Sequence, residues 1–204
     1  MTRVPKLEGR NVPVTKLDAG TALVLIDLQK ATVGAPCVPH TGPDVVTRAS
    51  ELAEAFRERG ATVVLVRVTE SEDRADGTPG RKDAPTYTGP MPTGWDEIVE
   101  ELSGHPGDIV ITKRNWGAFY GTDLDLQLRR RGITQVVLGG IATSIGVEST
   151  ARNAHELGYH VTLATDAMAD MDPEAHHNSI ERIFPMLGER GTSAEIIEML
   201  AKSN

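Results

Sequence analysis

Residues 134–159 read TQVVLGGIATSIGVESTARNAHELGY and contain the three parts of one α/β unit. Gln135–Leu138 is a short apolar run, typical of a strand that is buried on both faces. A glycine-containing turn runs from Gly140 to Gly146, and a helical pattern then continues to about Leu157. Open α/β sheets bind their ligands at such strand-to-helix turns, so this stretch predicts both the fold and the place of a site.

The same order of strand and helix repeats along most of the chain. This alternation predicts one three-layer α/β domain over residues 1–204, Rossmann-like, with a six-stranded, mostly parallel sheet and helices on both faces. The expected strands are Ala22–Asp27, Thr62–Val68, Asp108–Lys113, Gln135–Leu138, His160–Thr165 and Arg190–Thr192. The expected helices are Pro43–Arg59, Trp95–Leu102, a segment from an N-cap at Thr122 to Gly132, the segment ending near Leu157, a segment from an N-cap at Asp172 to Leu187, and Ala194–Lys202.

Residues 71–94 interrupt this alternation. The segment SEDRADGTPGRKDAPTYTGPMPTG is rich in glycine and proline and has no hydrophobic period. A loop of this length in a compact domain is usually functional or disordered. We predict a lid-like loop at 71–94.

Composition and charge exclude several classes of partner. The 204 residues carry 21 Lys and Arg against 29 Asp and Glu, a net charge of −8 without a basic stripe, which predicts no nucleic-acid and no membrane partner. The N-terminal residues lack the apolar core of a secretory signal, and Cys37 is the only cysteine, so we expect a cytoplasmic protein without an intrachain disulfide. No CxxC or HExxH motif is present, and we expect no metal and no cofactor.

Candidate catalytic groups lie at the ends of three expected strands. Asp27 ends the first expected strand, Lys113 ends the third, and the turn before Gly146 follows the fourth. The carboxyl ends of parallel strands meet at one edge of the sheet, so these groups are expected to converge. Taken singly, Asp27 fits a structural carboxylate that binds loop amides, and Lys113 fits an ordinary exposed lysine. Their combination at one edge favours a site.

The turn itself offers unpaired backbone N–H groups and the positive end of a helix dipole. A cysteine at position 146 would have a lowered pKa there and would be a nucleophile. The amides of Ala142 and Gly146 would then suit an oxyanion hole. Alternatively, the glycines only permit a tight turn and close packing.

Three motifs together resemble the isochorismatase-like hydrolases, a family that includes isochorismatase, nicotinamidase and N-carbamoylsarcosine amidase. They are LVLIDLQ at 23–29, KRNWGAFYGTDL at 113–124 and GGIATSIGVESTARNAHELGY at 139–159. The resemblance implies an Asp–Lys–Cys triad at the sheet edge, with Asp27 as the Asp, Lys113 as the Lys, and Gly146 in the place of the Cys. It also implies a cis peptide between Ile141 and Ala142.

Glycine at position 146 departs from the thiol chemistry of that family, because it closes the route through an acyl-enzyme. Cys37 does not match the nucleophile position. True isochorismatases resemble this chain in having glycine there, and they hydrolyse a vinyl ether without a nucleophilic side chain. The resemblance therefore implies Asp27 as general acid, with Lys113 positioning Asp27 and a substrate oxygen. The residues expected to bind substrate are Gln29, Trp116, Phe119, Ala142 and Thr143, although core packing explains Trp116 and Phe119 equally well.

Two other functions remain open. Asp27 would act as a base in the hydrolysis of another small substrate, or the protein would be an inactive relative that binds a metabolite. His155, His176 and His177 end no strand and are expected to be non-catalytic. The resemblance also suggests a homodimer or a higher homo-oligomer acting on a small-molecule substrate.

Overall fold

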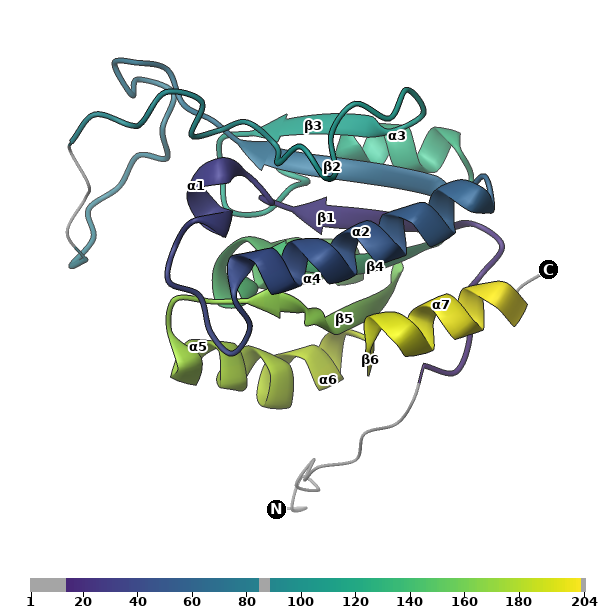
Figure 1. Cartoon of the computed structure of the whole chain (residues 1–204). Coiled ribbons are helices and arrows are strands. Elements are labelled where there is room, and N and C mark those ends of the chain that lie inside the picture. The colour runs from purple at the N-terminus through teal and green to yellow at the C-terminus, as the bar shows by residue number, and fades with distance from the viewer. Residues whose placement is uncertain (1–13, 85–88, 203–204) are drawn as a thin grey trace.

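A computed structural model describes residues 14–84 and 89–202 of the chain. Residues 1–13, 85–88 and 203–204, which belong to the predicted domain and in part to the predicted lid-like loop, lie outside the described residues. The described residues form a single α/β domain around one sheet (Figure 1).

The sheet has six strands in the order β3-β2-β1-β4-β5-β6, and every neighbouring pair is parallel. This is the order of a doubly wound fold, and its switch point lies between β1 and β4. The predicted parallel α/β sheet is therefore confirmed. The strands are β1 (Thr21–Ile26), β2 (Thr62–Val68), β3 (Ile109–Lys113), β4 (Gln135–Ile141), β5 (His160–Ala169) and β6 (Glu189–Gly191).

Helices cover both faces of the sheet (Figure 1). In that view α2 and α7 lie in front of the strands, and α3 and α4 lie behind them. The helices are α1 (Lys30–Val33), α2 (Gly42–Glu58), α3 (Leu124–Arg130), α4 (Glu148–Glu156), α5 (Pro173–Asn178), α6 (Phe184–Leu187) and α7 (Ser193–Lys202), with π-helical turns η1 (Thr143–Val147) and η2 (Ser179–Ile183).

The alternation of side chains along β1 explains the two cores. Leu23 and Leu25 pack with residues of α2 and α7, whereas Val24 and Ile26 pack with residues of α3 and α4. All six residues of β1 are buried, as expected for a central parallel strand covered on both faces. Burial on both faces fixes the register of β1 and thereby the position of the residue that follows it.

Strands β4 and β5 are longer than the sequence predicts. We expected β4 to end at Leu138, but it continues to Ile141, because Gly139 and Gly140 pair with β1. A Cβ at Gly140 would lie 2.1 Å from the Ile26 carbonyl oxygen, so this close approach requires glycine. Gly140, which we interpreted as the first residue of the turn, is therefore a strand residue, and the turn begins at Ala142.

The expected helix Trp95–Leu102 is wrong. The backbone of this segment pairs with the residues after β1 instead: the Lys30 amide donates to the Glu97 carbonyl (2.9 Å) and the Val99 amide to the Leu28 carbonyl (3.1 Å). Tertiary hydrogen bonds thus take the groups that a helix would have used.

Two further helices depart from prediction in their boundaries. The segment from Asp172 to Leu187 begins as expected, with Asp172 accepting hydrogen bonds from the Glu174 and Ala175 amides, but it is divided into α5, η2 and α6. The helix expected after Thr122 has its N-cap at Asp123, and the Thr122 hydroxyl accepts from the Leu124 amide (3.2 Å).

The described residues of the predicted lid-like loop, 71–84 and 89–94, project from the side of the molecule at which the strand arrows end (Figure 1). They are attached to the segment after β3 by the ion pair between Asp76 and Arg114 (2.5 Å) and by a hydrogen bond from Thr78 to the Arg114 carbonyl (3.2 Å). Across residues 14–84 and 89–202, no helix has both the length and the apolar character needed to cross a membrane.

Candidate active site

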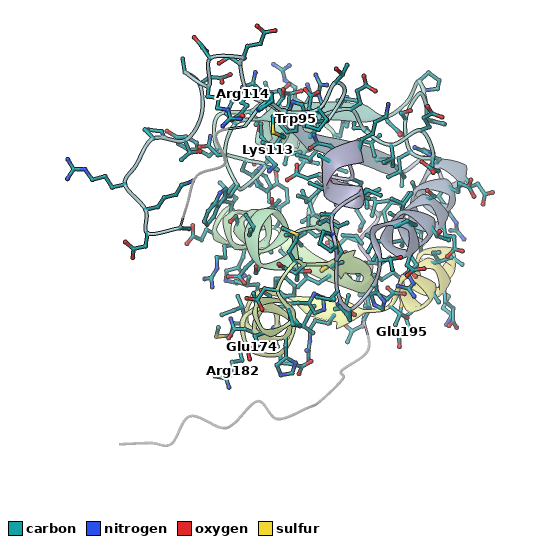
Figure 2. The ribbon with its side chains drawn as sticks, turned by 60° about the vertical axis from the view of Figure 1, so that its left-hand side comes forward. Trp95, Lys113, Arg114, Glu174, Arg182 and Glu195 are labelled. Atoms are coloured by element: carbon teal, nitrogen blue, oxygen red, sulfur yellow. The ribbon has the colours of Figure 1, made fainter. Side chains whose placement is uncertain are left out.

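The switch point of the sheet brings three predicted groups together. Asp27 follows β1 directly, Lys113 is the last residue of β3, and Gly146 lies in η1 after β4. Figure 2 brings this edge of the sheet forward, with Lys113 near the middle of the molecule and Glu174 of α5 at its lower margin. The predicted convergence of Asp27, Lys113 and Gly146 is therefore present.

The Asp27 carboxyl is buried and only half satisfied. Its side chain is 8 % exposed, and its Oδ2 accepts a hydrogen bond from Lys113 Nζ at 2.7 Å. Oδ1 has no hydrogen-bond partner among the described residues, which is costly for a buried polar atom. The backbone of Asp27 is left-handed (φ 51°), a conformation that is uncommon outside glycine and often marks functional positions.

Lys113 uses all three of its N–H groups on the protein. Nζ donates to Asp27 Oδ2 (2.7 Å), to the Trp116 carbonyl (2.9 Å) and to the Asn115 carbonyl (3.1 Å). Its side chain is 2 % exposed. Lys113 therefore orients Asp27, but it has no N–H group left for the substrate oxygen that we expected it to bind.

Burial decides the protonation of Asp27. Desolvation raises the pKa of Asp27 to about 6, and the charge and hydrogen bond of Lys113 oppose this rise. An Asp next to a lysine is normally held ionised, so the dominance of burial is a property of this tertiary setting. It leaves a carboxyl that gains and loses its proton near neutral pH.

Gly146 faces the Asp27 carboxyl. A Cβ added to Gly146 would lie 3.0 Å from Asp27 Oδ2 and 2.9 Å from Ile26 Cγ2. A side chain at this position would thus point at the carboxyl, and even its first carbon would crowd both neighbours. The peptide between Ile141 and Ala142 is cis, as the resemblance implied.

The turn is less open than a free helix start. The Ile145 and Val147 amides both donate to the Ala142 carbonyl, at 3.3 and 3.2 Å. The Ser144 amide donates to Asp170 Oδ2 at 2.7 Å. Several amides that we expected to be unpaired are therefore already used.

Asp170 was not among the predicted site residues, and His176 was expected to be non-catalytic. Asp170 follows β5 directly and is 3 % exposed, and His176 Nδ1 lies 2.8 Å from the Thr143 hydroxyl. Because we expected β5 to stop at Thr165, Asp170 did not stand at a strand end. A carboxylate that terminates a buried strand was the available signal.

The residues expected to bind substrate have different surroundings. The Gln29 amide is fully buried and bonds both ways with the backbone of Val68, at 2.8 Å each, so it holds the end of β2. Trp116 is 65 % exposed. Phe119 packs against the core on the α3 and α4 face, with its ring 5.9 Å from that of Tyr159, which favours core packing for this residue.

Ala142 and Thr143 lie in the turn, but both are buried, and Thr143 is 0 % exposed. Cys37 lies between α1 and α2, where its thiol contacts the Thr32 carbonyl at 3.6 Å and burial raises its pKa. That thiol belongs to a different loop from Gly146 and is not activated. Within the described part of the chain, no cluster of three or more His, Cys, Asp or Glu is placed to hold a metal ion.

Comparison with known proteins assigns the family. Residues 21–195 match the model of the isochorismatase domain. The chain belongs to the isochorismatase family. Among relatives, it is 48% identical over 180 residues to the isochorismatase family protein YecD of Escherichia coli O157:H7, covering 88% of this chain and 96% of YecD. The structure of an isochorismatase family protein from Burkholderia thailandensis has a TM-score of 0.88 at 44% identity, covering 93% of this chain and 98% of the other.

A more distant relative of this isochorismatase-family hydrolase carries an activity in its name. The chain is 31% identical over 191 residues to the ureidoacrylate amidohydrolase RutB of Azorhizobium caulinodans, covering 82% of this chain and 84% of RutB. The family thus includes enzymes named for C–N hydrolysis, and membership alone does not choose between C–N and ether bonds.

Proposed function

We propose that the protein hydrolyses a small anionic vinyl ether of the isochorismate type by general-acid catalysis, without a covalent intermediate. The observation that supports this most is the Asp27 carboxyl, which lies beside a residue without a side chain. Lys113 donates to one of its oxygens, and the other has no hydrogen-bond partner among the described residues. Such a carboxyl can donate a proton, and glycine at position 146 supplies no nucleophilic side chain.

The steps follow from the chemistry of vinyl ethers. The Asp27 carboxyl transfers its proton to the terminal vinyl carbon, which becomes a methyl group, and the ether carbon becomes an oxocarbenium ion. Water adds to that carbon and loses a proton to the Asp27 carboxylate. The resulting hemiketal breaks its C–O bond, and the leaving oxygen takes the hydroxyl proton. The products are pyruvate and an alcohol, and Asp27 is again protonated.

The raised pKa of Asp27 supports this role. With a pKa of about 6, roughly a tenth of the molecules carry the acid form at pH 7, against about a thousandth for an ordinary aspartic acid. Activity should therefore fall as pH rises above about 6, because the acid form is lost.

A second candidate is C–N hydrolysis with Asp27 as general base, which the similarity to RutB supports. Here the ionised carboxylate would activate water for direct attack on the carbonyl carbon of a small amide. The pH dependence is opposite, since activity would fall as pH drops below about 6.

One experiment separates these functions. The protein is incubated with isochorismate and, separately, with ureidoacrylate, and pyruvate and ammonia are measured against an Asp27→Asn control. We expect pyruvate from isochorismate, and in D₂O we expect its methyl group to carry one deuterium from the protonation step. Absence of pyruvate above the control would reject vinyl-ether hydrolysis for this substrate. Ammonia release that rises with pH would support the second candidate.

A further inference from the structure

Two side chains from the connection between β5 and α5 contact the turn that carries Gly146. Asp170 Oδ2 accepts a hydrogen bond from the Ser144 amide at 2.7 Å. His176 Nδ1 lies 2.8 Å from the Thr143 hydroxyl. These contacts hold two consecutive residues between Ala142 and Gly146. We refer to Asp170 and His176 together as the β5–α5 clamp.

Asp170 is itself held firmly. Its Oδ1 accepts from the Met171 amide (2.8 Å) and the Asp172 amide (3.3 Å), and its backbone pairs in both directions with Val38 at 2.8 Å. Both carboxyl oxygens are therefore occupied by amides. Asp170 acts as a fixed acceptor for the turn, and it has no free oxygen for proton transfer to a substrate.

His176 and Thr143 also resemble a base and a nucleophile, but burial argues against that role. Thr143 is 0 % exposed, so its hydroxyl does not reach a substrate. Burial lowers the pKa of His176, nearby Asp170 opposes this shift, and His40 and His177 add to it. A neutral imidazole can accept the hydroxyl proton of Thr143 at Nδ1, which makes this contact an anchor.

The position of the turn matters because Gly146 lies against Asp27. A Cβ built on Gly146 would lie 3.0 Å from Asp27 Oδ2. A small shift of the turn would therefore change the packing around the carboxyl. We propose that Asp170 and His176 are positioning residues, which hold the Ala142–Gly146 turn beside Asp27 for catalysis. The catalytic part of this inference rests on the proposed function.

Hydrogen exchange of the peptide that spans residues 141–148 tests the clamp without any substrate. In His176→Ala the buried Thr143 hydroxyl loses its partner, and we expect exchange in this peptide to rise roughly tenfold. Asp170→Asn should act similarly, because an asparagine places an N–H₂ donor against either the Ser144 or the Met171 amide. His176→Asn keeps a polar atom near the position of Nδ1 and should restore slow exchange.

Neighbouring residues supply matched controls. His177 is exposed and follows His176 in α5, so His177→Asn should leave exchange unchanged. Asp172 caps α5, and Asn is an equally good N-cap, so Asp172→Asn should also leave it unchanged. In a turnover assay, His176→Ala should lower kcat roughly a hundredfold with little change in KM, and His176→Asn should recover most of the loss.

The outcomes separate the clamp from the proposed function. Exchange that is equal in wild type, His176→Ala and Asp170→Asn would overturn the clamp, as would equal increases in the two controls. Faster exchange with unchanged kcat would overturn its catalytic role. If the wild type hydrolyses no vinyl ether, the proposed function fails, and exchange still decides whether Asp170 and His176 hold the turn.

Discussion

Strand β3 has a buried ion pair near each of its ends, and the two pairs differ in how fully their polar atoms are used. Before the strand, Arg57 donates two hydrogen bonds to Asp108, from Nε to Oδ1 at 3.2 Å and from Nη2 to Oδ2 at 2.5 Å. His105 Nδ1 adds a third contact to Asp108 Oδ1 at 3.2 Å. At the other end, Lys113 reaches only one oxygen of Asp27.

The difference separates a structural pair from a reactive one. Asp108 and Asp27 are buried to a similar degree, with side chains 4 % and 8 % exposed. The Asp108 carboxylate has a partner on each oxygen, so it stabilises the junction of α2 with β3. The Asp27 carboxyl has one oxygen without a partner in residues 14–84 and 89–202 and a raised pKa of about 6, so it can exchange a proton. Because the two side chains are similarly exposed, the oxygen that lacks a partner among the described residues is what distinguishes Asp27 from Asp108.

Substitution of each aspartate should separate the two roles most strongly. Asp27→Asn should lower kcat/KM roughly a thousandfold, because the general acid is lost. Asp108→Asn should leave turnover nearly unchanged but lower the free energy of unfolding by about 2 kcal/mol, because a charged hydrogen-bonded pair is broken. Steady-state kinetics and urea denaturation measure both. Comparable loss of turnover in a folded Asp108→Asn variant would contradict the distinction.

Replacement of Lys113 should shift the pH profile of activity, whereas replacement of Arg57 should not. Lys113 lowers the pKa of Asp27, so Lys113→Met should raise it above about 6 and move the fall of kcat/KM to higher pH. The rate at the optimum should drop roughly a hundredfold, because Asp27 is no longer oriented. Arg57→Met is the control and should leave the midpoint of the profile in place. An unmoved midpoint in Lys113→Met would show that another group titrates.

The free energy of unfolding should depend on pH because the pKa of Asp27 is raised in the folded state. The folded-state pKa of about 6 lies above the ordinary aspartic acid pKa of 3.8, so the stabilisation by the neutral carboxyl is full below about 3.8 and is lost as pH rises through 6. Between pH 4 and pH 8, Asp27→Asn should therefore gain stability relative to wild type by roughly 2–3 kcal/mol. Denaturation curves at several pH values measure this difference. A difference that stays constant with pH would mean that the folded and unfolded pKa values are equal.

An added methyl group should be tolerated at Gly107, beside the Arg57–Asp108 pair, but not at Gly146, beside the Lys113–Asp27 pair. Gly146→Ala places a carbon 2.9 Å from Ile26 Cγ2 and 3.0 Å from Asp27 Oδ2, so we expect a loss of about 1–3 kcal/mol in stability and a displaced carboxyl. Gly107→Ala, next to Asp108, meets only the edge of the His105 ring at 3.3 Å, and that ring can move. Thermal unfolding and turnover compare the two variants. Equal, small effects would show that the space beside Asp27 is larger than the structure indicates.

The smallest effect is expected from the side chain of Trp116. Its carbonyl accepts a hydrogen bond from Lys113 at 2.9 Å, whereas the residue as a whole is 65 % exposed. Trp116→Ala keeps the carbonyl and should change the free energy of unfolding by less than about 0.5 kcal/mol. If the indole contacts substrate, KM alone should rise. A large fall in kcat would instead show that the indole supports the Lys113 contacts.

Several parts of the fold were predictable because their signals are local. The strand at Thr62–Val68 has the predicted bounds, and α2 begins and ends within one residue of expectation. Continuous apolar runs identify strands that are buried on both faces, and a helical period identifies the face of α2 that packs on the sheet. The position of Asp27 and Lys113 at one edge followed from the parallel order of the strands.

The predictions of secondary structure that were wrong lie where segments far apart in the chain compete for the same backbone N–H and C=O groups. The segment Trp95–Leu102 has a helical pattern, yet its amides and carbonyls pair with residues after β1. Gly139 and Gly140 favour a turn by local propensity, yet they extend β4 because β1 approaches closely there. Strand β5 likewise continues to Ala169, so Asp170 follows it directly, a position that we did not predict because we expected β5 to end at Thr165.

The amino-acid sequence alone predicts the parallel α/β fold, the carboxylate after the first strand, the lysine at the end of the third, and the missing side chain at Gly146. These depend on the periodicity and identity of neighbouring residues. Three features required the folded structure: burial outweighs Lys113 in setting the pKa of Asp27, Lys113 has no donor left, and Asp170 and His176 contact the turn. Desolvation and hydrogen-bond partners depend on contacts between segments far apart in the chain, so they appear only when the chain is folded.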